Sequence, residues 1–334
     1  MAGSLFMRGG ANFQKVRLIG AKVGAQLSAK GSTFEGRFNA DRLEVTGDLS
    51  MRDGASFNDV DLSGAVIGGS LWLRDSDFYG HLDLTSVLIG DELDLNSPRR
   101  VVHRNPGDEN FPPPRWNERA RLTLRNAQVG ALNDTEDAWG LQPGRLDLVG
   151  FTYDRLGGVW ATKDSAMSAR STEWLRAWLA KQVGFSTSYN PQPFEQLAKV
   201  LRESGYPGKA DAILFAARDH QRDSPATPWP SKVELWLLWG LIGYGYHNGI
   251  ALLWFAALTG LGAWVCGKSP FGRRMRAAQR FWYSFDIALP LIALNKRHEA
   301  VKLRDGVLVY FYVHKLAGFV LASFLVAGLS GLTK

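Results

Sequence analysis

Residues 47–73 read GDLSMRDGASFNDVDLSGAVIGGSLWL, and this stretch decides the fold because it contains one pattern twice. A glycine, a polar residue and a leucine open each copy, at residues 47–49 and 69–71. The leucine recurs every 22 residues along the first part of the chain, at Leu5, Leu27, Leu49, Leu71 and Leu93. Such a fixed interval is typical of solenoids, in which each repeat forms one coil.

Each repeat holds short apolar segments that are separated by Gly, Asp, Asn or Ser. A helical repeat would instead need apolar residues three and four positions apart over a longer stretch. Short apolar segments between turn residues predict short strands joined at sharp corners. We therefore predict a right-handed β-helix, a solenoid with a core of stacked leucines and phenylalanines. It would have about seven coils and a length of roughly 30 Å.

A long interruption separates two of the coils. Residues 96–119 contain several prolines, and the next leucine segment begins at Leu122, 29 residues after Leu93. Within the interruption lies a basic cluster of Arg99, Arg100, His103 and Arg104. Because loops on rigid scaffolds often carry binding, this cluster is a candidate site for an anion or a protein partner. The alternative is a solvated insertion without special chemistry.

After residue 156 the pattern changes from strands to helices. Residues 171–179 (STEWLRAWL) form a capped amphipathic pattern, and residues 193–204 (PFEQLAKVLRES) begin with a proline that suits a helix start. A partner helix begins at Pro207 or Gly208, so the two helices form a hairpin. We predict that this hairpin caps the C-terminal edge of the β-helix, with peptide binding as the alternative. The predicted domains are residues 1–156, 157–230 and 231–334.

The last of these domains is predicted to be an α-helical transmembrane region. Residues 235–267 contain no Asp, Glu, Lys or Arg. Spans are predicted at about 248–267 and 314–333, with interfacial or re-entrant segments at 235–247 and 281–295. His314 and Lys315 are expected to reach the interface at the start of the second span. The small residues Ser323, Ala327 and Gly331 predict close helix packing and a homo-oligomer.

Basic charge lies between the two predicted spans. Residues 268–304 include Arg273, Arg274, Arg276 and Arg280, which we expect to contact anionic lipid headgroups. The excess of Lys and Arg places this loop in the cytoplasm. The first 30 residues lack the apolar core of a signal peptide, which predicts a cytoplasmic N-terminal domain at the cell (inner) membrane. Both placements require a short hairpin or a deformed entry before residue 268, and nucleic-acid binding is not expected.

Catalytic motifs are missing from the sequence. The chain has no G-x-S-x-G, phosphate-binding loop or H-E-x-x-H pattern, and its one cysteine, Cys266, excludes a disulfide framework. We therefore predict no catalytic residue, no cofactor and no metal site. The composition, 46% hydrophobic and 21% charged, excludes a disordered chain.

The membrane domain contains two further candidates. Gly243, Tyr244, Gly245 and Tyr246 are similar to the Gly-Tyr-Gly filter of potassium channels, although Leu241-Ile242 replaces the residues that usually precede it. The alternative is a glycine bend anchored by interfacial tyrosines. Asp286 is an acid within an apolar segment, where acids are costly and often functional, unless the segment lies at the interface.

Several motifs together resemble a known family. They are the 22-residue repeats running into FTYDRL, the segment NPQPFEQLAKVLRESG, the motif GYGY, and SFDIALPLIAL before a final small-residue span. The combination is similar to a bacterial, actinobacterial-type membrane protein family with N-terminal pentapeptide-like β-helix repeats and C-terminal transmembrane helices. That family is often labelled membrane-associated oxidoreductase. The resemblance implies the architecture alone, because no residues here match a redox cofactor site.

Two functional hypotheses of different classes follow. The first is a membrane-anchored, non-enzymatic scaffold or sensor that oligomerises through its membrane helices and presents the β-helix to a protein partner. The second is an oligomeric pore or ion channel gated by the cytoplasmic β-helix domain. An enzyme of unknown reaction is the third.

Overall fold

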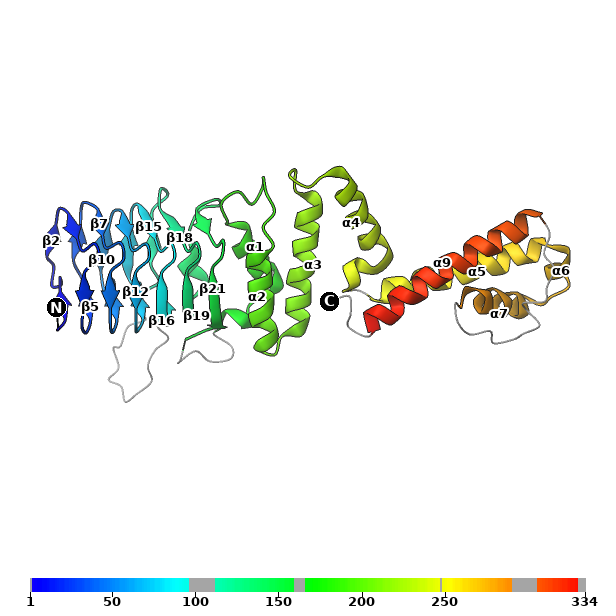
Figure 1. Ribbon diagram of the computed structural model, residues 1–334, viewed down its shortest axis with the longest axis horizontal. Helices are drawn as coiled ribbons and strands as arrows, with labels where there is room; N and C mark the ends of the chain where they lie inside the picture. Colours follow the sequence, from blue (N-terminus) through cyan, green and yellow to red (C-terminus); the bar gives the residue numbers. More distant parts are fainter. Residues whose placement is uncertain (1, 96–111, 159–165, 247, 290–304, 330–334) are drawn as a thin grey trace. The chain divides into compact units, whose positions relative to one another are not determined.

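The computed structural model describes residues 2–95, 112–158, 166–246, 248–289 and 305–329. The chain divides into two compact units, Met1–Ala226 and Thr227–Lys334. We refer to them as the solenoid unit and the helical unit (Figure 1).

The solenoid unit is built from parallel strands, mostly of two or three residues, that form three sheets. The first sheet contains β1 (Leu5–Phe6), β4 (Lys22–Val23), β5 (Leu27–Ser28), β8 (Glu44–Val45), β9 (Leu49–Ser50), β12 (Val66–Ile67), β13 (Leu71–Trp72), β16 (Leu88–Asp94), β19 (Gln128–Asn133) and β21 (Thr152–Leu156). The second contains β2 (Asn12–Phe13), β6 (Thr33–Phe34), β10 (Ala55–Phe57), β14 (Ser76–Phe78) and β17 (Arg115–Trp116). The third contains β3 (Val16–Arg17), β7 (Phe38–Asn39), β11 (Val60–Asp61), β15 (His81–Asp83), β18 (Arg121–Thr123) and β20 (Leu146–Asp147).

The recurring leucines pair with one another across neighbouring coils. The pairs Leu5↔Leu27, Leu27↔Leu49, Leu49↔Leu71 and Leu71↔Leu93 are each in parallel register. The interval of 22 residues is therefore the length of one coil, and the predicted β-helix is confirmed. The stack has about six turns.

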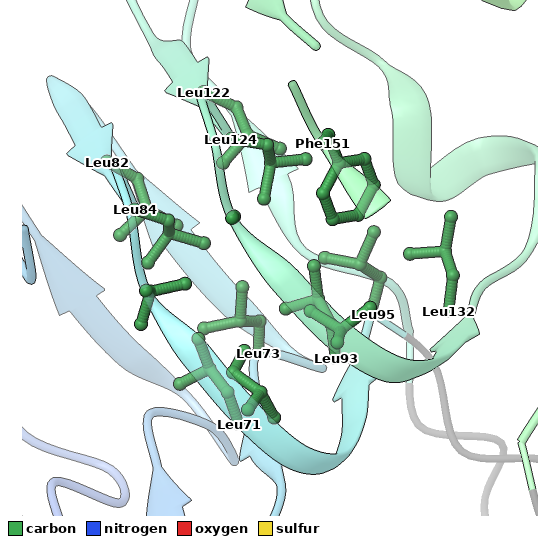
Figure 2. Packing of buried hydrophobic residues seen from close by; sticks show 14 of the residues in the cluster. Leu71, Leu73, Leu82, Leu84, Leu93, Leu95, Leu122, Leu124, Leu132 and Phe151 are labelled. Carbon is green, nitrogen blue, oxygen red and sulfur yellow. The ribbon is translucent and has the colours of Figure 1, made fainter. Parts of the chain in front are cut away.

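The core of the solenoid consists of side chains from equivalent positions of successive coils. Leucines from neighbouring strands lie above one another inside it, as Figure 2 shows for Leu71, Leu93 and Leu132. A second row is aromatic, with ring centroids 4.7–5.6 Å apart between stacked neighbours, and contains Phe13, Phe34, Phe57, Phe78 and Trp116. Burial of these rows supplies the main stabilisation, because the strands themselves are short.

The structure corrects the register after the interruption. Leu122 does not succeed Leu93; it pairs with Leu82 in the third sheet, and Leu93 pairs with Leu132. The coil has already resumed at β17, whose Trp116 pairs with Phe78. The predicted insertion of 96–119 therefore ends before β17, and residues 96–111 lie outside the described residues. The aromatic row marks this register, because the Trp116 ring stacks on the Phe78 ring with centroids 4.9 Å apart.

Glycine is required where two coils approach closely. A Cβ atom at Gly68 would lie 2.2 Å from the Thr46 carbonyl oxygen, and one at Gly90 would lie 2.2 Å from the Gly68 carbonyl oxygen. Real Cβ atoms do not approach backbone this closely, so these two corners exclude larger residues. The glycines that end the short apolar segments of the repeat thus allow neighbouring coils to approach as closely as the strand pairing requires.

Helices cover the C-terminal edge of the solenoid, as predicted. They are η1 (Glu136–Trp139), η2 (Met167–Ala169), α1 (Thr172–Ala180), α2 (Gln192–Glu203) and α3 (Pro207–Asp223) (Figure 1). The Gln192 and Gln196 side chains donate to the carbonyl oxygens of Phe151 and Tyr153, at 2.9 and 2.7 Å. Side chains of α2 thereby provide hydrogen-bond donors to backbone carbonyl groups along the outer edge of β21. The edge of β20 is covered by the segment at Gln182, which forms a parallel bridge with Leu146.

The helical unit contains α4 (Trp229–Ile242), η3 (Gly243–Gly245), α5 (Asn248–Lys268), α6 (Pro270–Arg273), α7 (Ala277–Ala288) and α9 (Asp305–Leu329). Two stretches, Gly249–Lys268 in α5 and Gly306–Val326 in α9, are long and apolar enough to cross a membrane. α7 packs against both α5 and α9. The segment expected at 281–295 is thus helical up to Ala288, and residues 290–304 lie outside the described residues.

The second candidate span begins earlier than the sequence predicts. α9 is already helical at Asp305, whereas we expected the span to start near residue 314. His314 is 1% exposed, so it does not reach toward an interface as expected. The expectation that His314 reaches the interface was wrong, because its ring is hydrogen-bonded inside the helix bundle.

Candidate functional site

A buried polar cluster joins three helices of the helical unit. The His314 ring of α9 has its Nε2 atom 3.0 Å from the Ser284 carbonyl oxygen of α7 and its Nδ1 atom 3.2 Å from the Tyr310 hydroxyl. The Ser284 hydroxyl donates to the Thr259 carbonyl oxygen of α5 at 2.8 Å. Because a carbonyl can only accept, Nε2 carries the proton in this contact, and in a neutral imidazole Nδ1 would accept from the Tyr310 hydroxyl. A neutral imidazole therefore satisfies both ring nitrogens.

This arrangement suits helix packing better than catalysis. The Ser284 hydroxyl hydrogen points to Thr259 and not to His314, so the histidine does not activate it as a nucleophile. Polar side chains that hydrogen-bond between helices stabilise contacts in an apolar environment. The cluster thus fixes α5, α7 and α9 relative to one another.

Close backbone contacts occur beside this cluster. A Cβ atom at Gly318 in α9 would lie 2.2 Å from the Ala288 carbonyl oxygen and 2.7 Å from its Cα atom. A Cβ atom at Gly262 in α5 would lie 2.1 Å from the Ser284 hydroxyl oxygen. At both positions the absence of a side chain on glycine lets α7 lie close to the neighbouring helix. Small residues have the same effect at contacts between membrane helices.

The variant Gly318→Ala is expected to destabilise the helical unit by about 1–3 kcal/mol, because its methyl group must displace the backbone of α7. The buried thiol of Cys266, the one cysteine of the chain, gives a local readout. Alkylation of this thiol in detergent should be faster in the variant than in the wild type. Gly306→Ala, on the same helix with open space around its Cβ position, is the control and should leave the rate unchanged. Equal rates in both variants would contradict the prediction.

The Gly-Tyr-Gly motif forms the turn between α4 and α5. Gly243 and Tyr244 both have a φ of 54°, in the left-handed region, and Gly245 has a φ of 86°. The Tyr244 side chain is buried at 7% exposure. The geometry is that of a bend, and ion conduction stays a prediction. Tyr246, which follows, is half-buried.

Asp286 and the four arginines lie near one another in sequence but differ in exposure. Asp286 is on α7 and is 6% exposed. Arg273, Arg274 and Arg276 are exposed around α6 and the start of α7. Arg280 is half-buried, and its Nε atom donates to the carbonyl oxygens of Gly272 and Met275 at 2.8 and 3.1 Å.

The remaining predicted site residues are only partly described. Ser323 is exposed on α9, where its hydroxyl donates to the Phe319 carbonyl oxygen at 2.8 Å, and Ala327 lies on the same helix. Gly331 lies outside the described residues. The basic cluster of Arg99, Arg100, His103 and Arg104 also lies outside them.

Sequence reasoning missed a charged corner of the solenoid. The guanidinium Cζ atoms of Arg52 and Arg74 lie 4.9 and 5.5 Å from the ring centroid of Trp72. Both Nε atoms lie 3.7 Å from the carboxylate of Asp53. Burial and the neighbouring Arg52 lower the pKa of Arg74, while Asp53 and the fully buried Asp94 oppose this shift.

The repeat could have revealed this corner. The residue three positions after each leucine is basic in four successive coils, at Arg8, Lys30, Arg52 and Arg74. The apolar periodicity that predicts the coils carries no information about this basic row. Stacked like charges repel, and the Asp53 carboxylate, which also lies 3.4 Å from the Lys30 ammonium, offsets part of that repulsion.

A second buried ionic group lies near the C-terminal end of the solenoid. The Arg170 guanidinium contacts both carboxylate oxygens of Asp134, at 2.8 and 3.1 Å, and Trp139 donates its indole N–H to the same carboxylate. Burial raises the pKa of Asp134, and Arg170 opposes this shift. Burial and the charge of Asp134 also raise the pKa of Tyr153. The group has no access for a substrate, since the Asp134 side chain is 0% exposed.

One face of the solenoid is hollowed by two shallow cavities that share Gly68. Their volumes are about 330 and 510 Å³. The acidic residues Asp48, Asp91 and Asp154 line them, and Asp48 accepts a hydrogen bond from the Ser70 backbone N–H at 2.9 Å. Within the described part of the chain, no group of three or more His, Cys, Asp or Glu residues is arranged to hold a metal ion.

Comparisons with other proteins give no family for this chain. No protein-family model matches it, and neither a curated protein nor a solved structure does. The chemistry of its own side chains therefore carries any functional conclusion.

Proposed function

We propose that this protein is a membrane-anchored scaffold, in which the solenoid presents a rigid surface to a protein partner and the helical unit holds it in the bilayer. The observation that carries this proposal is the combination, in one chain, of a capped solenoid with two helices long and apolar enough to cross a membrane. The scaffold would act without catalysis. A sensor role is part of the same proposal, since a partner or ligand bound to the solenoid would be held at the membrane.

The dimensions and exposure of the helices support the anchor. α5 has 21 residues and α9 has 25, which correspond to lengths of ~31 and ~37 Å, against a hydrocarbon core of ~30 Å. The apolar windows are 28% and 22% buried within the protein. A core helix of a soluble protein would be mostly buried, so these side chains need another apolar environment. Lipid provides it.

We further propose that the protein forms homo-oligomers through its membrane helices and lies in the cell (inner) membrane with the solenoid in the cytoplasm. The exposed Ser323 on α9 supports the first point, because a small residue on a lipid-facing surface allows a second helix to approach. The second point keeps both the solenoid and the basic residues after α5 in the cytoplasm. It requires α4 and α5 to form a short hairpin, because a single crossing by α5 would place those residues on the far side of the membrane. The oligomeric state in detergent tests the first point, and reporters fused after Gly267 and after Lys334 test the second.

The anchor is tested by placing one acid in each candidate span. The variant Leu261→Asp/Leu316→Asp changes two exposed leucines, one on α5 and one on α9. An acid near the centre of a span costs roughly 2.5–3.5 kcal/mol on insertion scales, so we expect the variant to be lost from the membrane fraction. The measurement is the share of the full chain that stays with membranes after an alkaline carbonate wash.

The control for this experiment is Val66→Asp/Leu88→Asp, which adds the same two charges to exposed apolar positions of the solenoid. This control should stay in the membrane as the wild type does. Release of the wild type by the wash would overturn the proposed anchor, and so would full retention of the variant with acids in both spans.

A further inference from the structure

The turn that follows α5 gathers basic and aromatic side chains at one end of the helical unit. Its exposed basic residues are Lys268, Arg273, Arg274 and Arg276, which we refer to as the basic rim. The aromatic side chains beside it are also exposed: Trp264, Phe271, Phe281 and Trp282. Charge and aromatic surface therefore occur together on the α5–α6–α7 segment.

Arg280 holds the backbone of this turn in place. Its Nε atom donates to the carbonyl oxygens of Gly272 and Met275, and its guanidinium lies over Gly267, where a Cβ atom would be 2.7 Å from Nη1. Ser269 adds two bonds, donating to the Cys266 carbonyl oxygen at 2.7 Å and accepting from the Gly272 N–H at 2.9 Å. The rim residues thus lie on a turn with a fixed backbone. Arg280 is not counted among them because its side chain hydrogen-bonds to that backbone.

The charge of this surface is uncompensated along the segment. Residues 268–289 contain five basic side chains and one acid, Asp286. Because Asp286 is 6% exposed, its carboxylate does not offset the rim at the surface. The Lys268 ammonium lies 3.4 Å from the centroid of the Trp264 ring, which keeps this cation next to an exposed indole at the end of a candidate span.

We propose that the basic rim binds the headgroups of anionic phospholipids at the bilayer surface where α5 ends. This inference rests on the proposed membrane anchor and adds the class of lipid. Lys and Arg at a membrane surface are attracted to anionic headgroups, and tryptophan and phenylalanine suit the adjacent interfacial layer. A rim beside an apolar helix end meets phosphate groups attached to lipid, so the occupant is the headgroup and not free phosphate.

The experiment compares lipids of equal acyl chains on the full chain in detergent. Native mass spectrometry of a titration with phosphatidylglycerol or phosphatidylcholine gives the apparent affinity for each. We expect the wild type to prefer phosphatidylglycerol by at least about tenfold, because each basic residue near the surface contributes several-fold. The variant Arg273→Gln/Arg274→Gln/Arg276→Gln should lose most of this preference, and added inorganic phosphate should not reproduce that loss.

The matched control is Lys15→Gln/Arg17→Gln/Arg176→Gln, which removes three exposed charges from the solenoid unit and should keep the preference. An unchanged preference in the rim variant would overturn the inference, and so would displacement of the lipid by free phosphate. Failure of the anchor has a separate signature. A full chain that stays monodisperse in water without detergent would remove the proposed function and this inference together.

Discussion

Replacing Phe57 with alanine is expected to lower the free energy of unfolding of the solenoid by about 3–5 kcal/mol. Phe57 is 0% exposed and stacks between Phe34 and Phe78, with centroid distances of 4.7 and 5.6 Å. Its edge also meets the Phe38 ring at 6.2 Å. Alanine would leave a cavity in the middle of the aromatic row, and the neighbouring coils cannot collapse into it because their strands are paired.

Amide hydrogen exchange of the full chain in detergent measures this effect locally. Peptides that cover β10 and β14 should exchange faster in the variant, since the opening free energy of these strands falls. Tyr79→Ala is the control, because Tyr79 is 50% exposed and surface substitutions change stability by roughly 0.5 kcal/mol or less. Similar protection of β10 in Phe57→Ala and in the wild type would refute a core role for the aromatic row.

Replacing Arg170 with methionine is expected to cost a similar amount, about 3–5 kcal/mol, for a different reason. The Arg170 side chain is 7% exposed and the Asp134 side chain is 0% exposed. Arg170 also lies over the Trp174 ring, at 4.2 Å from its centroid. Methionine fills much of the arginine volume but leaves the Asp134 carboxylate buried with its ionic partner removed.

A double substitution separates the loss of charge pairing from the loss of packing. In Asp134→Asn/Arg170→Met the buried charge is gone, so part of the stability lost in Arg170→Met should return. Urea unfolding of the solenoid unit within the full chain, followed by hydrogen exchange of β19 and β21, gives the two values. If the double variant is no more stable than Arg170→Met, the buried carboxylate is not the source of the cost.

The sequence predicts the solenoid well because its signal is periodic. Each leucine from Leu5 to Leu93 occupies an equivalent position in a coil, so a constant interval in sequence becomes a constant register in space. The hairpin cap was also predicted, since Pro193 and Gly205 mark the ends of its first helix. Periodicity and helix-end signals are local properties, so they can be read from the sequence without knowledge of tertiary contacts.

Other features depend on contacts between distant segments and could not be predicted. The pairing of Leu93 with Leu132 departs from the 22-residue interval, so the spacing of the leucines does not predict it. The burial of His314 depends on Ser284, which lies 30 residues away on another helix. The close approach at Gly318 likewise depends on Ala288. Of the four arginines expected to contact lipid, Arg273, Arg274 and Arg276 are exposed, whereas Arg280 supports the turn, and lipid contact stays a prediction.

The interruption of the β-helix has a consequence for how this molecule can vary. The strands before and after the interruption remain paired in parallel: β16 pairs with β19 in the first sheet, and β14 pairs with β17 in the second. Strand pairing between coils therefore does not depend on the length of the segment that connects the coils. A segment between two coils can therefore be lengthened or exchanged while the coils on either side keep their pairing.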